Sequence, residues 1–131
     1  MANYIASARS NKFRVRDISA LESAMPDSIE VYVESLPDNL VCLLVNDPDG
    51  NGWPSAIYDE ATEDWLDWDV EDAVAPHLLD GEWCVIKEVG AEKLRYLIGH
   101  ARAFNNKGES HYIDLDDIFK LLPNGVSTCD Y

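Results

Sequence analysis

Short runs in which apolar and polar residues alternate, with turn residues between them, constrain the fold of this chain most. In residues 28–36, SIEVYVESL, the apolar residues Ile29, Val31 and Val33 fall at every second position. Alternate side chains of an extended strand point to the same face, so this pattern predicts a strand with one buried face. A PDN turn and the apolar run LVCLLV (40–45) follow, and they predict a neighbouring strand inside a sheet.

The remaining runs extend this interpretation along the whole chain. Further strands are expected over residues 4–15, 53–59, 82–89, 93–105 and 111–115. The segment 53–59 would be the third strand of the meander, and GAE (90–92) would be the turn before 93–105. At 131 residues the chain is long enough for one domain with a sizeable core. We therefore expect a single α+β domain, residues 1–131, with a mostly antiparallel sheet of about five to six strands and two to three short helices.

The first expected helix covers residues 18–25. Asp17 is a suitable N-cap, because its carboxylate can accept hydrogen bonds from the free N–H groups of the first turn. Ile18, Leu21 and Met25 have the spacing of one buried stripe. Pro26 ends the helix.

The second expected helix begins after Asp69, which is again a suitable N-cap. Its apolar stripe consists of Val70, Ala73, Val74 and Leu78. Pro76 lies inside this span and is expected to kink the helix or to end it early. A last short helix is expected to begin at Asp116 or Asp117 and to end before Pro123 and Gly125.

Charge is distributed very unevenly along the chain, whose net charge is −15. Residues 1–16 contain four basic side chains and no acid, whereas residues 17–86 contain 18 acids and no Lys or Arg. Phosphate neutralisation by Lys and Arg supplies most of the affinity of proteins for nucleic acids, so direct nucleic-acid binding is not expected. An anionic surface attracts basic proteins, although solubility or a salty cytoplasm would also account for it.

The acids are densest in residues 59–72, DEATEDWLDWDVED, a segment without a basic residue. Its carboxylates are Asp59, Glu60, Glu63, Asp64, Asp67, Asp69, Glu71 and Asp72. Helix capping gives a local reason for about three of them. The others indicate a surface for a cationic partner. Trp65 and Trp68 lie in the middle of the segment, as core residues or as anchors of an interface.

Such carboxylates could imitate nucleic-acid phosphates if their spacing is suitable. In a helix, Glu60 with Asp64, Glu63 with Asp67, and Asp67 with Glu71 would lie about 5–6 Å apart at their Cβ atoms. In an extended segment, Asp67, Asp69 and Glu71 would share one face at intervals of roughly 6.6 Å. Both spacings are of the same order as the spacing along a nucleic-acid strand.

The sequence does not favour a metal site or a cofactor. Asp47, Asp49, Asn51 and Gly52 match the first half of an EF-hand loop, but its twelfth position holds Tyr58 instead of a bidentate carboxylate. A hairpin turn is the better interpretation of this segment. The three histidines are dispersed and lack metal-ligand spacing with the cysteines.

Catalysis is not indicated either, because no nucleophile motif or glycine-rich phosphate loop is present. The three cysteines are widely spaced, which suits reduced thiols. No run approaches the roughly 20 apolar residues that span a bilayer, and the N-terminus lacks a hydrophobic signal region. A cytoplasmic protein is therefore expected.

Two stretches of the chain contain recognisable motifs: the N-terminal pattern NY-x4-RSN-x-F-x-VRD, and the pattern G-x-EKLRY-x-x-G at Gly90–Gly99. These motifs resemble those of a family of small accessory proteins carried by phages and other mobile elements. The family carries no assigned chemistry, so the resemblance implies no catalytic residue. It implies that the gene lies among the accessory genes of phages and plasmids, where inhibitors of host defence are frequent.

Together, these observations predict a non-enzymatic inhibitor inside the bacterial host cell. It would act as an acidic nucleic-acid mimic on the basic surface of a defence complex, of the anti-CRISPR or antirestriction type. Two alternatives stay open at this point: an immunity-type protein that neutralises a basic nuclease toxin, and a small calcium-binding or enzymatic module around residues 47–60.

Overall fold

The structure is a computed structural model, and it describes residues 4–46, 50, 52–92 and 96–127. Its strands are β1 (Tyr4–Ser10), β2 (Phe13–Arg14), β3 (Ile29–Ser35), β4 (Leu40–Val45), β5 (Ala56–Asp59), β6 (Asp64–Asp67), β7 (Cys84–Glu92), β8 (Tyr96–Phe104) and β9 (Ser110–Asp114). Its helices are α1 (Ile18–Ala24), α2 (Val70–Val74) and the 3-10 helices η1 (Ala75–His77) and η2 (Leu115–Leu121).

The main sheet contains seven of the strands, and β5 and β6 form a separate two-stranded sheet. In the main sheet β4 pairs with β3 on one side and with both β1 and β2 on the other, and β1 continues to β7, β8 and β9. All the pairings among the described strands are antiparallel. The expected α+β class is therefore confirmed. The segment 4–15, expected as one strand, is interrupted at Asn11 and Lys12 and counts as two.

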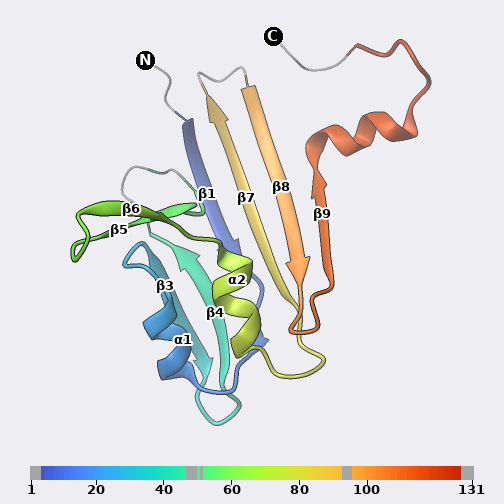
Figure 1. Cartoon of the computed structure of the whole chain (residues 1–131). Helices are drawn as coiled ribbons and strands as arrows, with labels where there is room; N and C mark the ends of the chain where they lie inside the picture. Colours follow the sequence, from blue (N-terminus) through green and yellow to red (C-terminus); the bar gives the residue numbers. More distant parts are fainter. Residues whose placement is uncertain (1–3, 47–49, 51, 93–95, 128–131) are drawn as a thin grey trace.

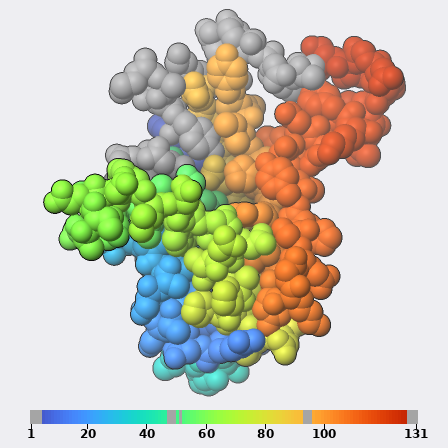
Figure 2. Space-filling view, in the orientation of Figure 1, coloured from blue at the N-terminus to red at the C-terminus, as the bar shows by residue number. Residues whose placement is uncertain are grey.

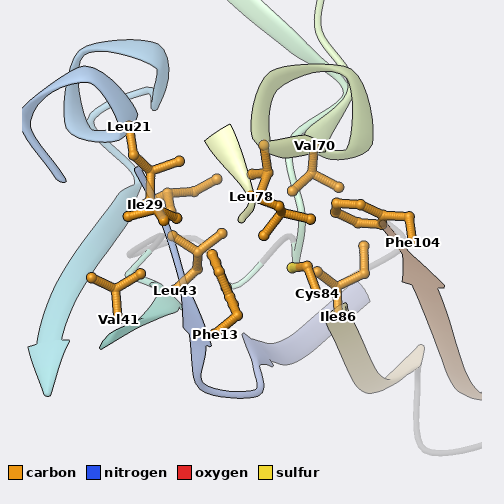
Figure 3. Packing of buried hydrophobic residues seen from close by; sticks show 12 residues of the cluster. Phe13, Leu21, Ile29, Val41, Leu43, Val70, Leu78, Cys84, Ile86 and Phe104 are labelled. Atoms are coloured by element: carbon orange, nitrogen blue, oxygen red, sulfur yellow. The ribbon is translucent and has the colours of Figure 1, made fainter. Parts of the chain in front are cut away.

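Both α-helices lie against the same face of the main sheet, which we call the helix face (Figure 1). The hydrophobic core fills the space between them and the sheet (Figure 3). Strands contribute Phe13, Leu43 and Phe104, which are fully buried, and Val70 and Leu78 pack onto them from α2 and the segment after it. Burying one such side chain contributes roughly 1.5–3 kcal/mol.

The helix signals in the sequence are confirmed. Asp17 caps α1 and accepts hydrogen bonds from the backbone N–H groups of Ser19 and Ala20. Asp69 caps α2 in the same way and accepts from the N–H of Asp72. Pro76 does end the α-helical turns, because η1 replaces them from Ala75 onward.

Two boundaries and the burial of one residue differ from the sequence-based expectation. Residues 90–92, expected as a turn, instead continue β7, whose last pair with β8 is Glu92 with Tyr96. Val33, expected on the buried face of β3, is exposed. The C-terminal helix begins at Leu115, and Asp114 caps it in a capping box with Asp117.

The thiols of Cys42 and Cys84 are free and buried, as expected for reduced cysteines. Burial raises the pKa of the Cys84 thiol far above its ordinary value, and nearby Arg102 offsets this only in part. Cys129 lies outside the described residues. No helix in the described ranges is long and apolar enough to cross a membrane.

Candidate protein-interaction site

The acidic segment forms a hairpin that projects from the domain. The sequence suggested that residues 53–59 form the third strand of the meander, and this expectation is wrong. Instead β5 pairs with β6 in register from Ala56 with Asp67 to Asp59 with Asp64. Figures 1 and 2 show this hairpin, in green, standing out from the body of the molecule beside the N-terminal half of the sheet. We call β5, β6 and their turn the acidic hairpin.

The turn of the acidic hairpin is held by its own side chains. Asp59 Oδ1 accepts a hydrogen bond from the N–H of Ala61 at 3.0 Å, and its Oδ2 accepts from the hydroxyl of Thr62 at 3.1 Å. Glu63 closes the turn with a φ of 54°, a left-handed conformation that favours Gly or Asn. A glutamate is therefore kept at a position where it strains the backbone.

An exposed aromatic pair occupies one face of the acidic hairpin. Tyr58 and Trp65 are directly opposite each other on β5 and β6, and their rings meet edge to face with centroids 5.6 Å apart. Trp65 is 64% exposed. Large exposed aromatic side chains are typical anchors of protein–protein interfaces. Leu66 is also exposed and points to the other face of the hairpin.

The two tryptophans of the segment have different environments. Trp65 is at the surface, which fits an interface residue. Trp68 is half-buried and packs against the hydrophobic core. Its backbone N–H donates to the carbonyl of Ser55 at 3.0 Å. Trp68 therefore fixes the base of the hairpin to the domain.

The eight carboxylates separate into two groups. Arg102 of β8 binds two of them: its Nη2 lies 3.0 Å from Asp69 Oδ1, and its Nη1 lies 3.7 Å from Glu71 Oε1. With Asp59, which holds the turn, these acids have structural partners. Within the described part of the chain, the remaining five make no ion pair: Glu60, Glu63, Asp64, Asp67 and Asp72.

The helical spacing proposed for the mimic is wrong. Glu60, Glu63, Asp64 and Asp67 belong to a turn and a strand, so pairs four residues apart do not stack on a helix. The extended alternative also fails, because Asp69 is a cap and Glu71 lies in α2. Carboxylates instead surround the hairpin: Asp67 shares the face of Trp65, whereas Asp64 points to the opposite face.

A buried carboxylate ties the chain before the hairpin to the main sheet. Glu88 of β7 is only 8% exposed, and its Oε1 accepts a hydrogen bond from the backbone N–H of Trp53 at 2.8 Å. Its Oε2 lies 3.3 Å from His100 Nε2 on β8, and the ring of His100 stacks on Tyr112 of β9. Because Gly52 has no side chain, the carboxylate of Glu88 can occupy the space next to it. This cluster orients the base of the acidic hairpin.

We find no match for this chain among models of protein families, curated proteins or solved structures. The resemblance to phage accessory proteins stays a prediction. Lys93, Leu94 and Arg95 of its second motif lie outside the described residues, as do Asp47, Asp49 and Asn51 of the half EF-hand loop. Within the described ranges, no group of His, Cys, Asp and Glu is arranged to hold a metal ion.

Three of the four basic residues in the N-terminal segment form ion pairs within the domain. Lys12 lies 3.0 Å from Glu34, and Arg14 and Arg16 lie close to Glu82 and Asp80. These pairs are largely exposed, so each contributes only about 0–1 kcal/mol. None of them reaches the acidic hairpin, which keeps its negative charge.

Sequence reasoning missed Tyr58, Glu88 and Arg102. In the sequence, Tyr58 matters only because it occupies the position where an EF-hand loop needs a carboxylate, whereas its position in β5 makes it the partner of Trp65. Glu88 and Arg102 occupy core-facing positions of β7 and β8, in line with buried residues two positions away. A charged residue at a core-facing position was the signal that could have identified them.

Replacing Glu63 with asparagine is expected to stabilise the protein by about 0.5–1 kcal/mol. Asparagine tolerates the left-handed backbone, and the substitution also removes a charge from a crowded turn. Chemical denaturation measures the change. Glu60→Asn is the matched control, since it removes the same charge from a neighbouring turn residue for which no positive φ is recorded. Equal effects of the two substitutions would show that Glu63 is not strained.

Proposed function

We propose that this protein is an inhibitor that binds a basic surface of a nucleic-acid-targeting defence complex, of the CRISPR effector type, through the acidic hairpin. One observation carries the proposal. Carboxylates without ion-pair partners among the described residues surround an exposed Tyr58–Trp65 pair on a hairpin that projects from the domain. The phage resemblance supports the choice of a defence complex as the partner.

Repulsion within the hairpin supports binding to a cationic partner. Asp59 and Asp64 lie directly opposite each other across β5 and β6, and like charges in that position destabilise a strand pair. An isolated two-stranded hairpin is marginally stable even without such repulsion. A cationic surface would offset this repulsion, so the hairpin would be more stable in contact with such a partner than in water.

The geometry favours insertion into a cleft. Carboxylates on both faces and at the tip would meet basic walls on two sides, as phosphates of a bound strand do. Trp65 and Tyr58 would supply apolar contact area or stack on arginine side chains of the partner. Nucleic acid would then be excluded from the same cleft.

Reversal of two hairpin charges tests the proposal. The double variant Asp64→Lys, Asp67→Lys is expected to weaken binding to a purified CRISPR effector by about a hundredfold, because like charges facing each other cost several kcal/mol. The fold is expected to persist, since a lysine at position 64 would face Asp59 favourably and position 67 is exposed opposite Ala56. Binding and inhibition of target-DNA capture are measured at about 0.1 M and about 1 M salt.

The matched control is Glu22→Lys, Asp116→Lys, which changes the net charge equally at exposed positions outside the hairpin. It is expected to bind almost as tightly as the parent protein. If both double variants lose the same affinity, net charge is responsible and the hairpin is not the site. If the protein instead inactivates basic nucleases and leaves CRISPR effectors active, the immunity-type function replaces this proposal.

A further inference from the structure

The face of the main sheet opposite the helices, which we call the back face, is apolar over four adjacent strands. In β7 and β8, residues that point away from the core are as apolar as those that point into it. Strands of this composition are typical of sheets that are covered on both sides. The back-face residues of β1, β7, β8 and β9 are Ile5, Ser7, Arg9, Val85, Lys87, Val89, Ala91, Leu97, Gly99, Ala101, Ala103, His111 and Ile113.

No carboxylate occurs among these positions, although the chain contains 25 acids. The charged groups among these positions are Arg9 and Lys87, which are paired in register on β1 and β7. Glu30 of β3 lies on the same side of the sheet, but it is separated from Arg9 by β4. They border a shallow groove of about 380 Å³ that Leu44 and Val89 also line. The back face is thus a weakly cationic, apolar region of a strongly anionic molecule.

Large apolar side chains on the back face are open to solvent. Leu97 is 70% exposed, Ile5 is 67% exposed and Val89 is 64% exposed. Leu115 of η2 covers Gly99, and Leu115 is itself more than half exposed, so it extends the apolar surface. Contiguous apolar patches of this kind mark interaction sites in soluble proteins.

We propose that the back face binds a second copy of this chain, so that two sheets pack face to face in a symmetric dimer. The charge distribution argues for this occupant. A basic partner would be attracted to the acidic hairpin and repelled by Arg9 and Lys87. Two copies, each with a net charge of −15, can approach with least repulsion through the back face of β1, β7, β8 and β9, whose described positions lack carboxylates.

The back face is also complementary to itself in size. A two-fold axis along the strands, between β7 and β8, places each residue of β7 over its cross-strand neighbour in the other copy. The neighbours of Val85 and Lys87 are Ala103 and Ala101, and the neighbour of Leu97 is Ala91. Large side chains therefore meet small ones, as close packing requires. Lys87 of one copy faces an alanine, so the cations of the two copies do not meet.

Sedimentation equilibrium and two lysine substitutions test the dimer. The parent protein is expected at about twice the 14.7 kDa of one chain, and association is expected to strengthen from about 0.1 M to about 1 M salt, which screens the repulsion between the copies. Leu97→Lys is expected to weaken association at least tenfold. Leu36→Lys is the matched control, because Leu36 is 69% exposed in the turn after β3.

Two results would overturn the proposal: a mass of 14.7 kDa at every concentration and salt, or equal effects of the two lysine substitutions. Because both leucines are exposed, neither substitution is expected to unfold the chain, and circular dichroism checks this. The opposite salt dependence separates this face from the acidic hairpin, whose binding is expected to weaken with salt. Each proposal can therefore fail while the other holds.

Discussion

Replacement of Gly52 with alanine is expected to lower the free energy of unfolding by about 3 kcal/mol. Gly52 has a φ of 78°, and an L-residue in this region costs roughly 1–2 kcal/mol. The new Cβ would also clash with Glu88 Oε1, so the carboxylate would have to move. Movement would weaken its hydrogen bond to the N–H of Trp53 and its contact with His100. Urea denaturation measures the loss.

Gly108 provides the matched control for this substitution. Its φ is 83°, and a Cβ added there meets no atom within 4 Å. Gly108→Ala is therefore expected to cost only the backbone term, about 1–2 kcal/mol. Combining Gly52→Ala with Glu88→Ala removes the clash, so Gly52→Ala should then cost about as much as Gly108→Ala. If Gly52→Ala costs the same with and without Glu88, the carboxylate does not require this glycine.

This result would also give Gly52 a role that does not depend on calcium. The sequence places Gly52 at the sixth position of a half EF-hand loop, where a glycine allows a sharp turn. In the structure its positive φ and its contact with Glu88 account for the same residue type. The glycine is thus explained by the contact through which Glu88 attaches the base of the hairpin to the sheet.

Local signals were sufficient to predict much of this fold. Asp17 and Asp69 were recognisable as caps because capping depends only on the next three residues. The strands from Ile29 to Val45 followed from alternation and one turn, and β3 and β4 are neighbours as expected. The pairing of β7 with β8 was predicted for the same reason, since hairpins join strands that are adjacent in sequence.

The candidate site depends on contacts that no local pattern encodes. Nothing in residues 53–59 shows that they leave the main sheet and pair with Asp64–Asp67, because the alternation of β5 suits either partner. Arg102 lies 33 positions after Asp69, and Glu88 lies 35 positions after Trp53. Which of eight similar carboxylates have structural partners is therefore decided by the tertiary fold.

Charge reversal at Asp69 is expected to lower the free energy of unfolding by about 2–3 kcal/mol, whereas the same change at Asp67 should have almost no effect. Lysine at position 69 removes the cap of α2, worth about 1 kcal/mol, and places a cation at the helix N-terminus. It also replaces an ion pair with Arg102 by repulsion, a contribution reduced by the partial exposure of both groups. Asp67 is exposed in β6 and makes no ion pair within the described ranges, so the effect there should stay within about 0.5 kcal/mol.

Asp69→Asn separates the two contributions, because asparagine caps a helix about as well as aspartate but cannot form the ion pair. Its loss of stability is expected to lie between those of Asp67→Lys and Asp69→Lys, with an unchanged denaturant slope. Equal losses at positions 67 and 69 would contradict the division of the acidic segment into carboxylates that stabilise the domain and carboxylates without an ion pair. If the division holds, acids with structural partners must be left intact when the partner-binding surface is mapped, because their substitution would reduce binding through unfolding.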